Sequence, residues 1–199
     1  MSGLKHLPSY FDRRAQEVLV ATLRDAIADA PFYTPVMPRS GRPFTVRMSN
    51  LGTLGWVSDR EGYRYQQTHP ETGASWPPIP EMVMEVWRRV SDYAREPEAC
   101  LVNYYREGAR MGLHRDADEE DFSAPVVSIS LGDTAIFRIG GTERGGRTET
   151  LKLASGDVMV MGGASRLRYH GIDRVLSGTS TLLEHGGRLS LTLRRVTRP

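Results

Sequence analysis

The sequence predicts an α+β fold that is mainly β, with an antiparallel sandwich or barrel of the jelly-roll kind as its core. Two observations predict it: short strand-forming segments recur through the second half of the chain, and glycine-containing turns separate them. The expected strands are Cys100–Tyr105, Pro125–Leu131, Ala135–Ile139, Thr150–Leu153, Asp157–Met161 and Leu189–Val196. The turns between them include Gly132–Asp133, Gly140–Gly141, Ser155–Gly156 and Gly186–Gly187.

Two segments before this strand region have the periodicity of helices. Apolar residues spaced three and four apart predict a helix from Phe11 to about Ala30, which Pro31 ends, and a second from Ile79 to about Ala94. Between the two helices, residues 32–65 alternate glycine, proline and aromatic residues with short strand-like pieces, including Thr45–Ser49 and Gly62–Tyr65. We expect a hairpin-rich cover there.

The composition is that of an ordinary single domain. The chain has 199 residues, of which 39% are hydrophobic and 25% charged, and it contains no apolar run long enough to span a membrane. The sequence predicts a cytoplasmic protein. The single Cys100 excludes a disulfide framework and a multi-cysteine zinc site and is expected to be buried. A net charge of +2 is too small to indicate nucleic-acid binding by itself.

His114 and Asp116 are the centre of the functional prediction. Residues two apart in an extended strand face the same side, so the imidazole and the carboxylate project together as half of a metal site. His170, after a long strand-forming stretch, is the best candidate for the third ligand. Two histidines and one carboxylate on one face of a metal leave positions open for a co-substrate and O₂, as in non-haem Fe(II) oxygenases.

The last strand alternates strictly. Leu189, Leu191 and Leu193 share one face, and Arg188, Ser190, Thr192 and Arg194 share the other. A polar row of this kind usually faces water. The alternative is that its two arginines hold a dicarboxylate inside a pocket by bidentate pairing.

The ordered set of motifs resembles the AlkB-type Fe(II)- and 2-oxoglutarate-dependent dioxygenases, which repair alkylated nucleic-acid bases. The resemblance covers roughly residues 48–195. The motifs are Asn103-Tyr-Tyr105, His114-x-Asp116-x-Asp118, Val127-Ser-Ile-Ser-Leu-Gly132, Gly156-Asp-Val158, Ser165-Arg-Leu-x-Tyr-His170-Gly171 and Arg188-x-Ser-x-Thr-x-Arg194. The resemblance implies a double-stranded β-helix (jelly-roll) core at about 100–196, a nucleotide-recognition lid at about 32–65, and one catalytic domain over 1–199.

The resemblance also implies the site residues. His114, Asp116 and His170 would bind Fe(II); Asn103, Tyr105, Arg188, Ser190 and Arg194 would bind 2-oxoglutarate. Ser190 departs from the family pattern, which often has Asn there, and Leu193 stands where Phe is often found. Neither residue is a metal ligand, so we expect the departures to change affinity or geometry and leave the chemistry in place.

On the substrate side, the family's lid implies that Trp56 stacks on an extruded base and that Tyr63 contacts a nearby phosphate. Asp118 would accept a hydrogen bond from an exocyclic amine and favour cationic bases such as 1-methyladenine and 3-methylcytosine. Arg144 and Arg147 lie on a glycine-rich loop within reach of phosphates, as does Arg166 beside the distal histidine, although such arginines are usually only solvated. His6, His69 and His185 have no partner at ligand spacing and are expected on the surface or in loops.

The expected function is therefore oxidative demethylation of N-alkylated bases in single- or double-stranded DNA, with RNA as a further substrate. A monomer would use Fe(II) as its cofactor and consume O₂ and 2-oxoglutarate, with release of formaldehyde, succinate and CO₂. Two alternatives remain open at this point. One is an oxygenase acting on a protein or small molecule, and the other is a non-catalytic metal-binding or nucleic-acid-binding jelly roll.

Overall fold

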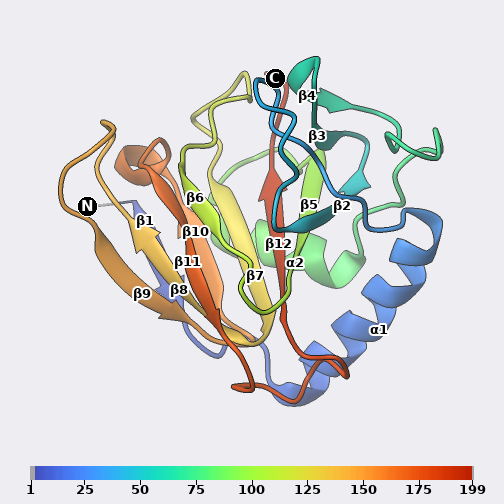
Figure 1. Ribbon diagram of the computed structural model, residues 1–199. Helices are drawn as coiled ribbons and strands as arrows, with labels where there is room; N and C mark the ends of the chain where they lie inside the picture. Colours follow the sequence, from blue (N-terminus) through green and yellow to red (C-terminus); the bar gives the residue numbers. More distant parts are fainter. Residues whose placement is uncertain (1–2, 199) are drawn as a thin grey trace.

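Two antiparallel sheets face each other in the computed structural model, which describes residues 3–198 (Figure 1). The six-stranded sheet has the order β1-β10-β7-β12-β5-β2, and the four-stranded sheet the order β6-β11-β8-β9. The strands of the large sheet are β1 (Leu4–Leu7), β2 (Arg47–Gly52), β5 (Ala99–Tyr105), β7 (Val126–Gly132), β10 (Val158–Met161) and β12 (Arg188–Arg194). Those of the small sheet are β6 (Met111–His114), β8 (Thr134–Ile139), β9 (Glu149–Leu153) and β11 (His170–Leu176).

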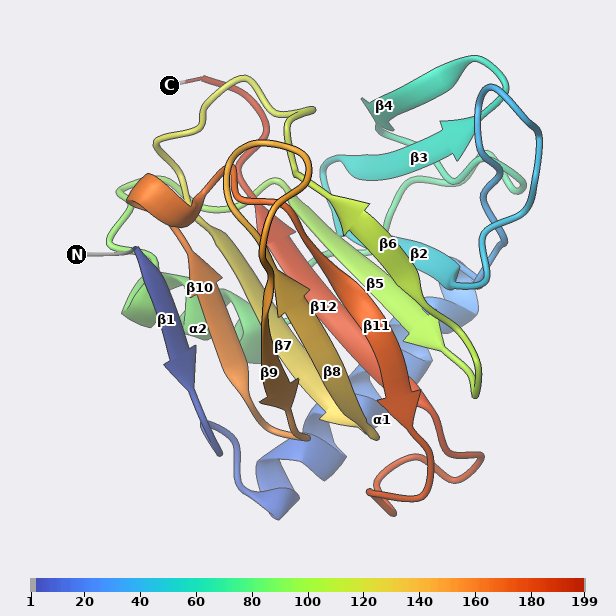
Figure 2. The same ribbon diagram turned by 60° about the vertical axis from the view of Figure 1, so that its left-hand side comes forward.

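The two helices cover the outer face of the large sheet. Figure 2 shows α1 (Arg13–Asp29) and α2 (Glu81–Val90) behind that sheet, with the small sheet in front. The Asp12 side chain caps α1 by accepting from the Ala15 backbone N–H, and α2 starts directly after Pro80. Trp87 packs between helix and sheet with 1% of its surface exposed.

The alternation of β12 sorts its side chains between two cores. Leu189, Leu191 and Leu193 pack under the helices together with apolar residues of β5, β7 and β10. The opposite face points between the sheets, where a second apolar cluster includes Met48, Phe137 and Ile172. The polar row on this face is buried along its whole length and lines a cavity. Of the two interpretations that the sequence leaves open for this row, the structure therefore supports the one that places it inside a pocket.

A two-stranded hairpin, β3 (Gly55–Asp59) and β4 (Gly62–Gln66), lies beyond the edge of the large sheet (Figure 2). It belongs to the segment 32–65, for which the sequence predicts a cover. Part of that segment is instead core sheet, because β2 pairs with β5 over its whole length and buries Met48 and Leu51. Strand pairing is non-local, so local sequence does not distinguish a lid strand from a sheet strand.

The expected strands are present with ends that shift by one to a few residues, and four strands were not predicted. These are β1, β3, β6 and β11. The last two carry His114 and His170. The sequence predicts that His170 follows a long strand-forming stretch. In the structure it is instead the first residue of β11, after a 3₁₀ turn η1 (Gly163–Ser165) and a short loop. The second helix also ends at Val90, earlier than predicted.

No helix in residues 3–198 is both long and apolar enough to cross a membrane.

Candidate active site

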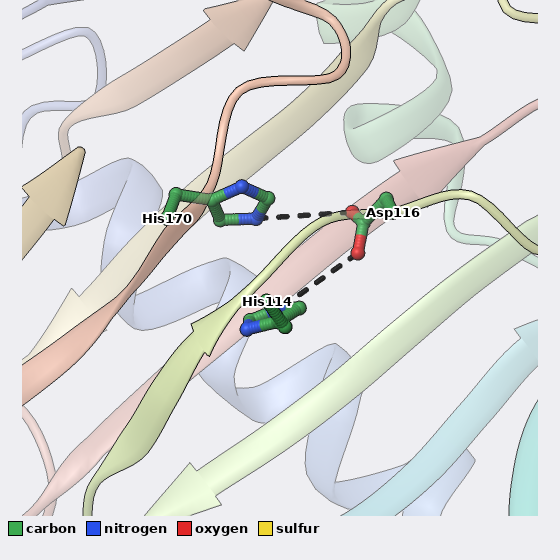
Figure 3. Close-up of side chains that lie close together, drawn as sticks. All are labelled: His114, Asp116 and His170. Atoms are coloured by element: carbon green, nitrogen blue, oxygen red, sulfur yellow. Dashed lines mark ion pairs between the residues drawn. The ribbon is translucent and has the colours of Figure 1, made fainter. Parts of the chain in front are cut away.

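A His-Asp-His cluster forms where β6 and β11 meet. His114 is the last residue of β6 and pairs in register with His170, the first residue of β11, while Asp116 follows two residues after His114. One potential ligand atom from each side chain lies within 4.8 Å of the others. Figure 3 shows the three groups pointing toward one another. The pairing of two strands thus brings together residues that are more than fifty positions apart in the chain.

Backbone carbonyls orient both imidazoles. His114 Nδ1 lies 2.9 Å from the Gly112 carbonyl oxygen, and His170 Nδ1 lies 3.0 Å from that of Arg168. A carbonyl only accepts, so Nδ1 carries the proton and the Nε2 lone pair is free. The two Nε2 atoms lie 3.7 and 4.0 Å from Asp116 carboxylate oxygens. A carbonyl that accepts from Nδ1 in this way fixes the tautomer of a metal-binding histidine.

The electrostatics keep Asp116 and His170 in metal-binding form. Burial by itself would raise the pKa of Asp116, but Arg194 and the two imidazoles hold that pKa well below its ordinary range. Arg194 donates from Nε and Nη2 to the same Asp116 oxygen at 3.0 and 2.8 Å. Burial lowers the pKa of His170 to about 4, and the Asp116 charge only partly opposes this. At neutral pH the site therefore offers a carboxylate and a neutral imidazole from these residues.

The cluster opens into a cavity of about 520 Å³ between the sheets. Its inner wall is formed by β5 and β12 and carries the residues that the sequence assigns to a co-substrate: Asn103, Tyr105, Arg188, Ser190 and Arg194. Arg188 is 1% exposed and lies over the Tyr105 ring, with its Cζ 5.3 Å from the ring centroid. Its Nη2 donates to Ser130 Oγ at 3.0 Å. Burial lowers the pKa of Arg188, as expected for a cation with no anion beside it.

The mouth of the cavity is aromatic and acidic. Trp56 Nε1 donates to Asp118 Oδ2 at 2.8 Å, and the Tyr63 ring stacks on Trp56 with centroids 5.4 Å apart and planes 21° apart. Phe44 approaches Trp56 edge-on. All these residues line the cavity, as does Arg144 from the loop between β8 and β9. The structure thus brings every predicted site residue to one cavity, together with the His-Asp-His cluster.

The family model of the 2OG-Fe(II) oxygenase superfamily matches residues 3–194. The chain belongs to this superfamily. It is 50% identical over 193 residues to an alpha-ketoglutarate-dependent dioxygenase AlkB homolog of Caulobacter vibrioides, covering 97% of this chain and 87% of the relative. It is 41% identical over 172 residues to alpha-ketoglutarate-dependent dioxygenase AlkB of Escherichia coli K12, covering 84% and 79%. Within the superfamily, the chain is an AlkB-type dioxygenase.

Structural similarity agrees with this assignment. A solved structure described as that of OsALKBH1 superposes with a TM-score of 0.78 at 32% identity, covering 98% of this chain and 99% of that one. A more distant relative in Arabidopsis thaliana, 32% identical over 97% of this chain and 48% of its own length, carries the name DNA N(6)-methyladenine demethylase ALKBH1C. The predicted jelly-roll fold is confirmed.

The cavity fits the Fe(II) and 2-oxoglutarate of the AlkB-type dioxygenases. Four buried side-chain nitrogen or oxygen atoms lack a hydrogen-bond partner among residues 3–198, and all belong to the inner wall: Asn103 Oδ1, Arg188 Nε and Nη1, and Arg194 Nη1. Buried donors without partners are costly, and a buried cation without an anion is more so. A dicarboxylate supplies acceptors for both arginines. The His-Asp-His set is the ligand type of non-haem iron.

Sequence reasoning missed a buried network that joins the lid hairpin to this wall. Tyr65 donates its hydroxyl to Glu119 Oε1 at 2.5 Å, and Glu119 Oε2 accepts from Arg166 Nη2 at 2.9 Å. Arg194 Nε lies 3.5 Å from the same Glu119 side chain. One sequence feature could have indicated a role for Tyr65: side chains two apart in a strand share a face, so Tyr65 lies on the same face as Tyr63. The sequence leaves Arg166 either as a phosphate contact or, more often for such arginines, as a solvated side chain; it is 2% exposed, which fits neither.

Three further expectations have outcomes in the structure. His69 is not a surface residue: it is 1% exposed, and its ring contacts the Pro31 carbonyl and two backbone N–H groups of its own loop. Cys100 is fully buried in the core under the helices, as predicted, and burial raises the pKa of its thiol to about 12. Arg147, unlike Arg144, does not line the cavity.

Proposed function

We propose that this AlkB-type dioxygenase removes N-methyl groups from bases of the 1-methyladenine and 3-methylcytosine type in DNA, with RNA as a further substrate. The observation that supports the proposal is that one cavity is lined by the His-Asp-His cluster, by the inner wall with its two arginines, and by Trp56 and Asp118. The name of the Arabidopsis relative, a DNA N(6)-methyladenine demethylase, supports a nucleic-acid substrate.

The metal cluster and the inner wall each have a proposed role. His114, Asp116 and His170 hold Fe(II). Arg188 pairs with one carboxylate of 2-oxoglutarate and Arg194 with the carboxylate nearer the metal, and Asn103, Tyr105 and Ser190 complete the co-substrate site. Arg194 also bonds Asp116, so one side chain couples the co-substrate wall to a metal ligand.

The mouth selects the base. A base inside a duplex cannot reach the metal while stacked, so the enzyme takes single strands or flips the base out. Trp56 offers its indole face, and its N–H holds Asp118 in place, leaving the second carboxylate oxygen for an exocyclic amine. The negative charge favours a cationic methylated base over the neutral base that the reaction leaves behind.

The reaction uses few protein groups. Iron held by His114, Asp116 and His170 would supply the O₂-dependent oxidation that converts 2-oxoglutarate to succinate and CO₂ and the N-methyl group to a hydroxymethyl group, which leaves as formaldehyde. The chain orients the methyl group toward the metal through Trp56 and Asp118, and its apolar interior, including Phe137 and Ile172, keeps bulk water out.

The decisive experiment incubates the purified protein with Fe(II), ascorbate, 2-oxoglutarate and a 1-methyladenine oligonucleotide. Succinate and oligonucleotide mass are followed together. Loss of one methyl mass per succinate is expected, and Asp116→Ala should form neither product. Succinate without demethylation would discard the lesion substrate and favour another substrate class. Neither product, with metal bound, would favour a non-catalytic protein.

The same preparation tests three further expectations. Paired single-stranded and duplex substrates measure strand preference, and an RNA version measures the second substrate class. Size-exclusion chromatography tests the predicted monomer. Cell fractionation tests the predicted cytoplasmic location.

A further inference from the structure

Tyr65 connects the β3–β4 hairpin to a buried acid. It pairs directly with Trp56 across the hairpin, so the two side chains share one face of it. Trp56 donates to Asp118, which is exposed at the mouth of the cavity. Tyr65 donates to the next residue, Glu119, which is 5% exposed. One hairpin thus bonds two adjacent acids, one at the mouth and one in the interior.

Arg166 holds Glu119 in place. Its Nη2 donates to Glu119 Oε2 at 2.9 Å. Its other two nitrogens donate to backbone carbonyls, Nη1 to that of Asp116 at 2.7 Å and Nε to that of Ala124 at 2.9 Å. A buried ion pair with its hydrogen bonds satisfied resists displacement, because separating it would leave two buried charges uncompensated. Glu119 Oε2 is therefore fixed, and only Oε1 is able to exchange partners.

Two donors lie beside Glu119 Oε1. The Tyr65 hydroxyl is 2.5 Å from it and Arg194 Nε is 3.5 Å from it. Arg194 Nε instead donates to Asp116 Oδ2 at 3.0 Å, and Nη2 donates to the same oxygen at 2.8 Å. The remaining nitrogen, Nη1, has no partner among residues 3–198. The guanidinium thus bonds Asp116 through one edge and keeps Nη1 for a ligand.

The Tyr65 hydroxyl decides how this guanidinium is turned. Burial raises the pKa of Tyr65 well above its ordinary range, and the Glu119 charge adds to this against the opposing effect of Arg194, so the hydroxyl keeps its proton and donates. A buried carboxylate oxygen that loses its donor attracts another, because an unpaired buried acceptor is costly. Arg194 Nε is already 3.5 Å away. Without the hydroxyl, the guanidinium would turn toward Glu119, weaken its bonds to Asp116 and displace Nη1.

We propose that Tyr65 is a positioning residue for the co-substrate: by occupying Glu119 Oε1 it keeps the Arg194 guanidinium turned so that Nη1 faces a carboxylate of 2-oxoglutarate. The inference rests on the proposed function and deepens it, since it adds a residue of the base-binding hairpin to the co-substrate site. Tyr65 does not line the cavity, so it acts through Glu119 and not by contact with the co-substrate. The hairpin that presents Trp56 to a base therefore also sets the affinity for 2-oxoglutarate.

Tyr65→Phe removes the hydroxyl and retains the ring. Isothermal titration calorimetry of 2-oxoglutarate into the anaerobic Mn(II)-loaded protein measures co-substrate affinity without turnover. We expect the Kd to rise about tenfold, the scale of one lost hydrogen bond to a charged group. Tyr93→Phe is the matched control, because Tyr93 donates to Asp121 in the same loop at 2.5 Å and does not line the cavity. Its Kd should equal that of wild type. An unchanged Kd in Tyr65→Phe, or an equal rise in both variants, would overturn the proposal.

A double-mutant cycle tests whether Tyr65 acts through Glu119. Glu119→Gln keeps the shape of the side chain and removes the charge that would attract Arg194. In that background, Tyr65→Phe should change the Kd for 2-oxoglutarate by less than about twofold. The same tenfold loss in both backgrounds would show that Tyr65 acts by another route and would reject the proposed role. If Glu119→Gln does not fold, the calorimetry of Tyr65→Phe against Tyr93→Phe decides alone.

Steady-state kinetics separate co-substrate from base. Tyr65→Phe should raise the KM for 2-oxoglutarate about tenfold and leave the KM for a 1-methyladenine oligonucleotide within about twofold, since Trp56 and Asp118 keep their contact. A loss confined to the KM for oligonucleotide would make Tyr65 a base-binding residue and contradict the positioning role.

The calorimetry needs no nucleic acid, so it also separates this proposal from the proposed function. A wild type that binds 2-oxoglutarate with the expected dependence on Tyr65 but does not demethylate would overturn the proposed function and retain the positioning role. A wild type that demethylates, with no effect of Tyr65→Phe on 2-oxoglutarate, would do the reverse.

Discussion

Arg188 has an environment that makes sense only with an anion beside it. It is buried, it stacks on Tyr105, and one nitrogen bonds Ser130, while Nε and Nη1 have no partner among residues 3–198. A planar fork matches a carboxylate with two parallel hydrogen bonds, which an ammonium does not provide. The geometry of the fork, and not only its charge, is therefore expected to set co-substrate affinity.

Arg188→Lys keeps the charge and removes the fork. We expect the KM for 2-oxoglutarate to rise about tenfold or more, with iron affinity unchanged because Arg188 contacts no metal ligand. Steady-state succinate formation and metal titration measure the two quantities. Arg195→Lys, a neighbouring arginine that does not line the cavity, is the matched control. An unchanged KM in Arg188→Lys would remove this residue from the co-substrate site.

His170 gives the metal-free protein a defined pH dependence. Burial lowers its pKa from an ordinary 6.5 to about 4. Between these values the unfolded chain binds a proton that the folded chain does not, so the free energy of unfolding falls as the pH is lowered through this window. Urea titrations at pH 6.5 and 4.5 should show a smaller pH effect in His170→Gln than in wild type, with the exposed His185→Gln as control. Identical pH effects in all three would contradict the assignment.

At the scale of elements, the metal cluster depends on the close approach of β6 and β11. A Cβ on Gly171 would lie 2.5 Å from the Met111 carbonyl oxygen and 2.7 Å from that of Gly112. Both are backbone atoms of β6, so they cannot move aside without moving the strand. By contrast, a Cβ on Gly112 would meet nothing within 4 Å.

Gly171→Ala is therefore expected to push His170 away from His114 and weaken metal binding about tenfold or more, since displaced ligands lose favourable coordination geometry. Gly112→Ala, on the facing strand, is the matched control and should bind metal like wild type. Titration with Mn(II) under anaerobic conditions measures both. Equal affinity in the two variants would show that strand separation does not control the site.

The β3–β4 hairpin presents Trp56 through two separable contacts, the indole face and the N–H that holds Asp118. Trp56→Phe retains an aromatic face and loses the hydrogen bond, whereas Trp56→Ala loses both. We expect KM for methylated oligonucleotide to rise in the order wild type, Phe, Ala, with each step about three- to thirtyfold, the range of one stacking or hydrogen-bond contribution. KM for 2-oxoglutarate should stay constant. A KM for oligonucleotide that does not respond to Trp56→Ala would contradict the stacking role.

At the scale of the whole molecule, the sequence predicts the site better than it predicts the strands that build it. Strict alternation in 188–194 identifies a strand, and the spacing of His114 and Asp116 identifies half of a metal site, because both are local patterns. The strands that carry His114 and His170 are short or irregular, with a register shift between His170 and Ile172. Their pairing comes from the fold as a whole, which local propensity does not encode. The same holds for Glu119 and Arg166, which meet only after folding.

The two sheets also divide the binding residues between them. The metal candidates lie on β6, on the loop that follows it and on β11, whereas the arginines of the co-substrate wall lie on β12 of the other sheet. Arg194 links the two groups through Asp116. Metal alone thus has ligands from the small-sheet side, and metal with 2-oxoglutarate engages both sheets.

The Tm should therefore depend on both ligands: it should fall when 2-oxoglutarate is removed and fall further when the metal is removed. A ligand at a hundred times its Kd stabilises the folded state by about 2.7 kcal/mol, so Mn(II) alone should raise the Tm by several degrees and Mn(II) with 2-oxoglutarate by clearly more. 2-Oxoglutarate without metal should raise the Tm only slightly. Differential scanning fluorimetry of the protein stripped with chelator measures all four states. Arg188→Lys should reduce only the 2-oxoglutarate increment, and Asp116→Ala should reduce both increments, because Asp116 joins the metal site to Arg194. If Arg188→Lys kept the full increment, the co-substrate would not engage the large sheet through this residue.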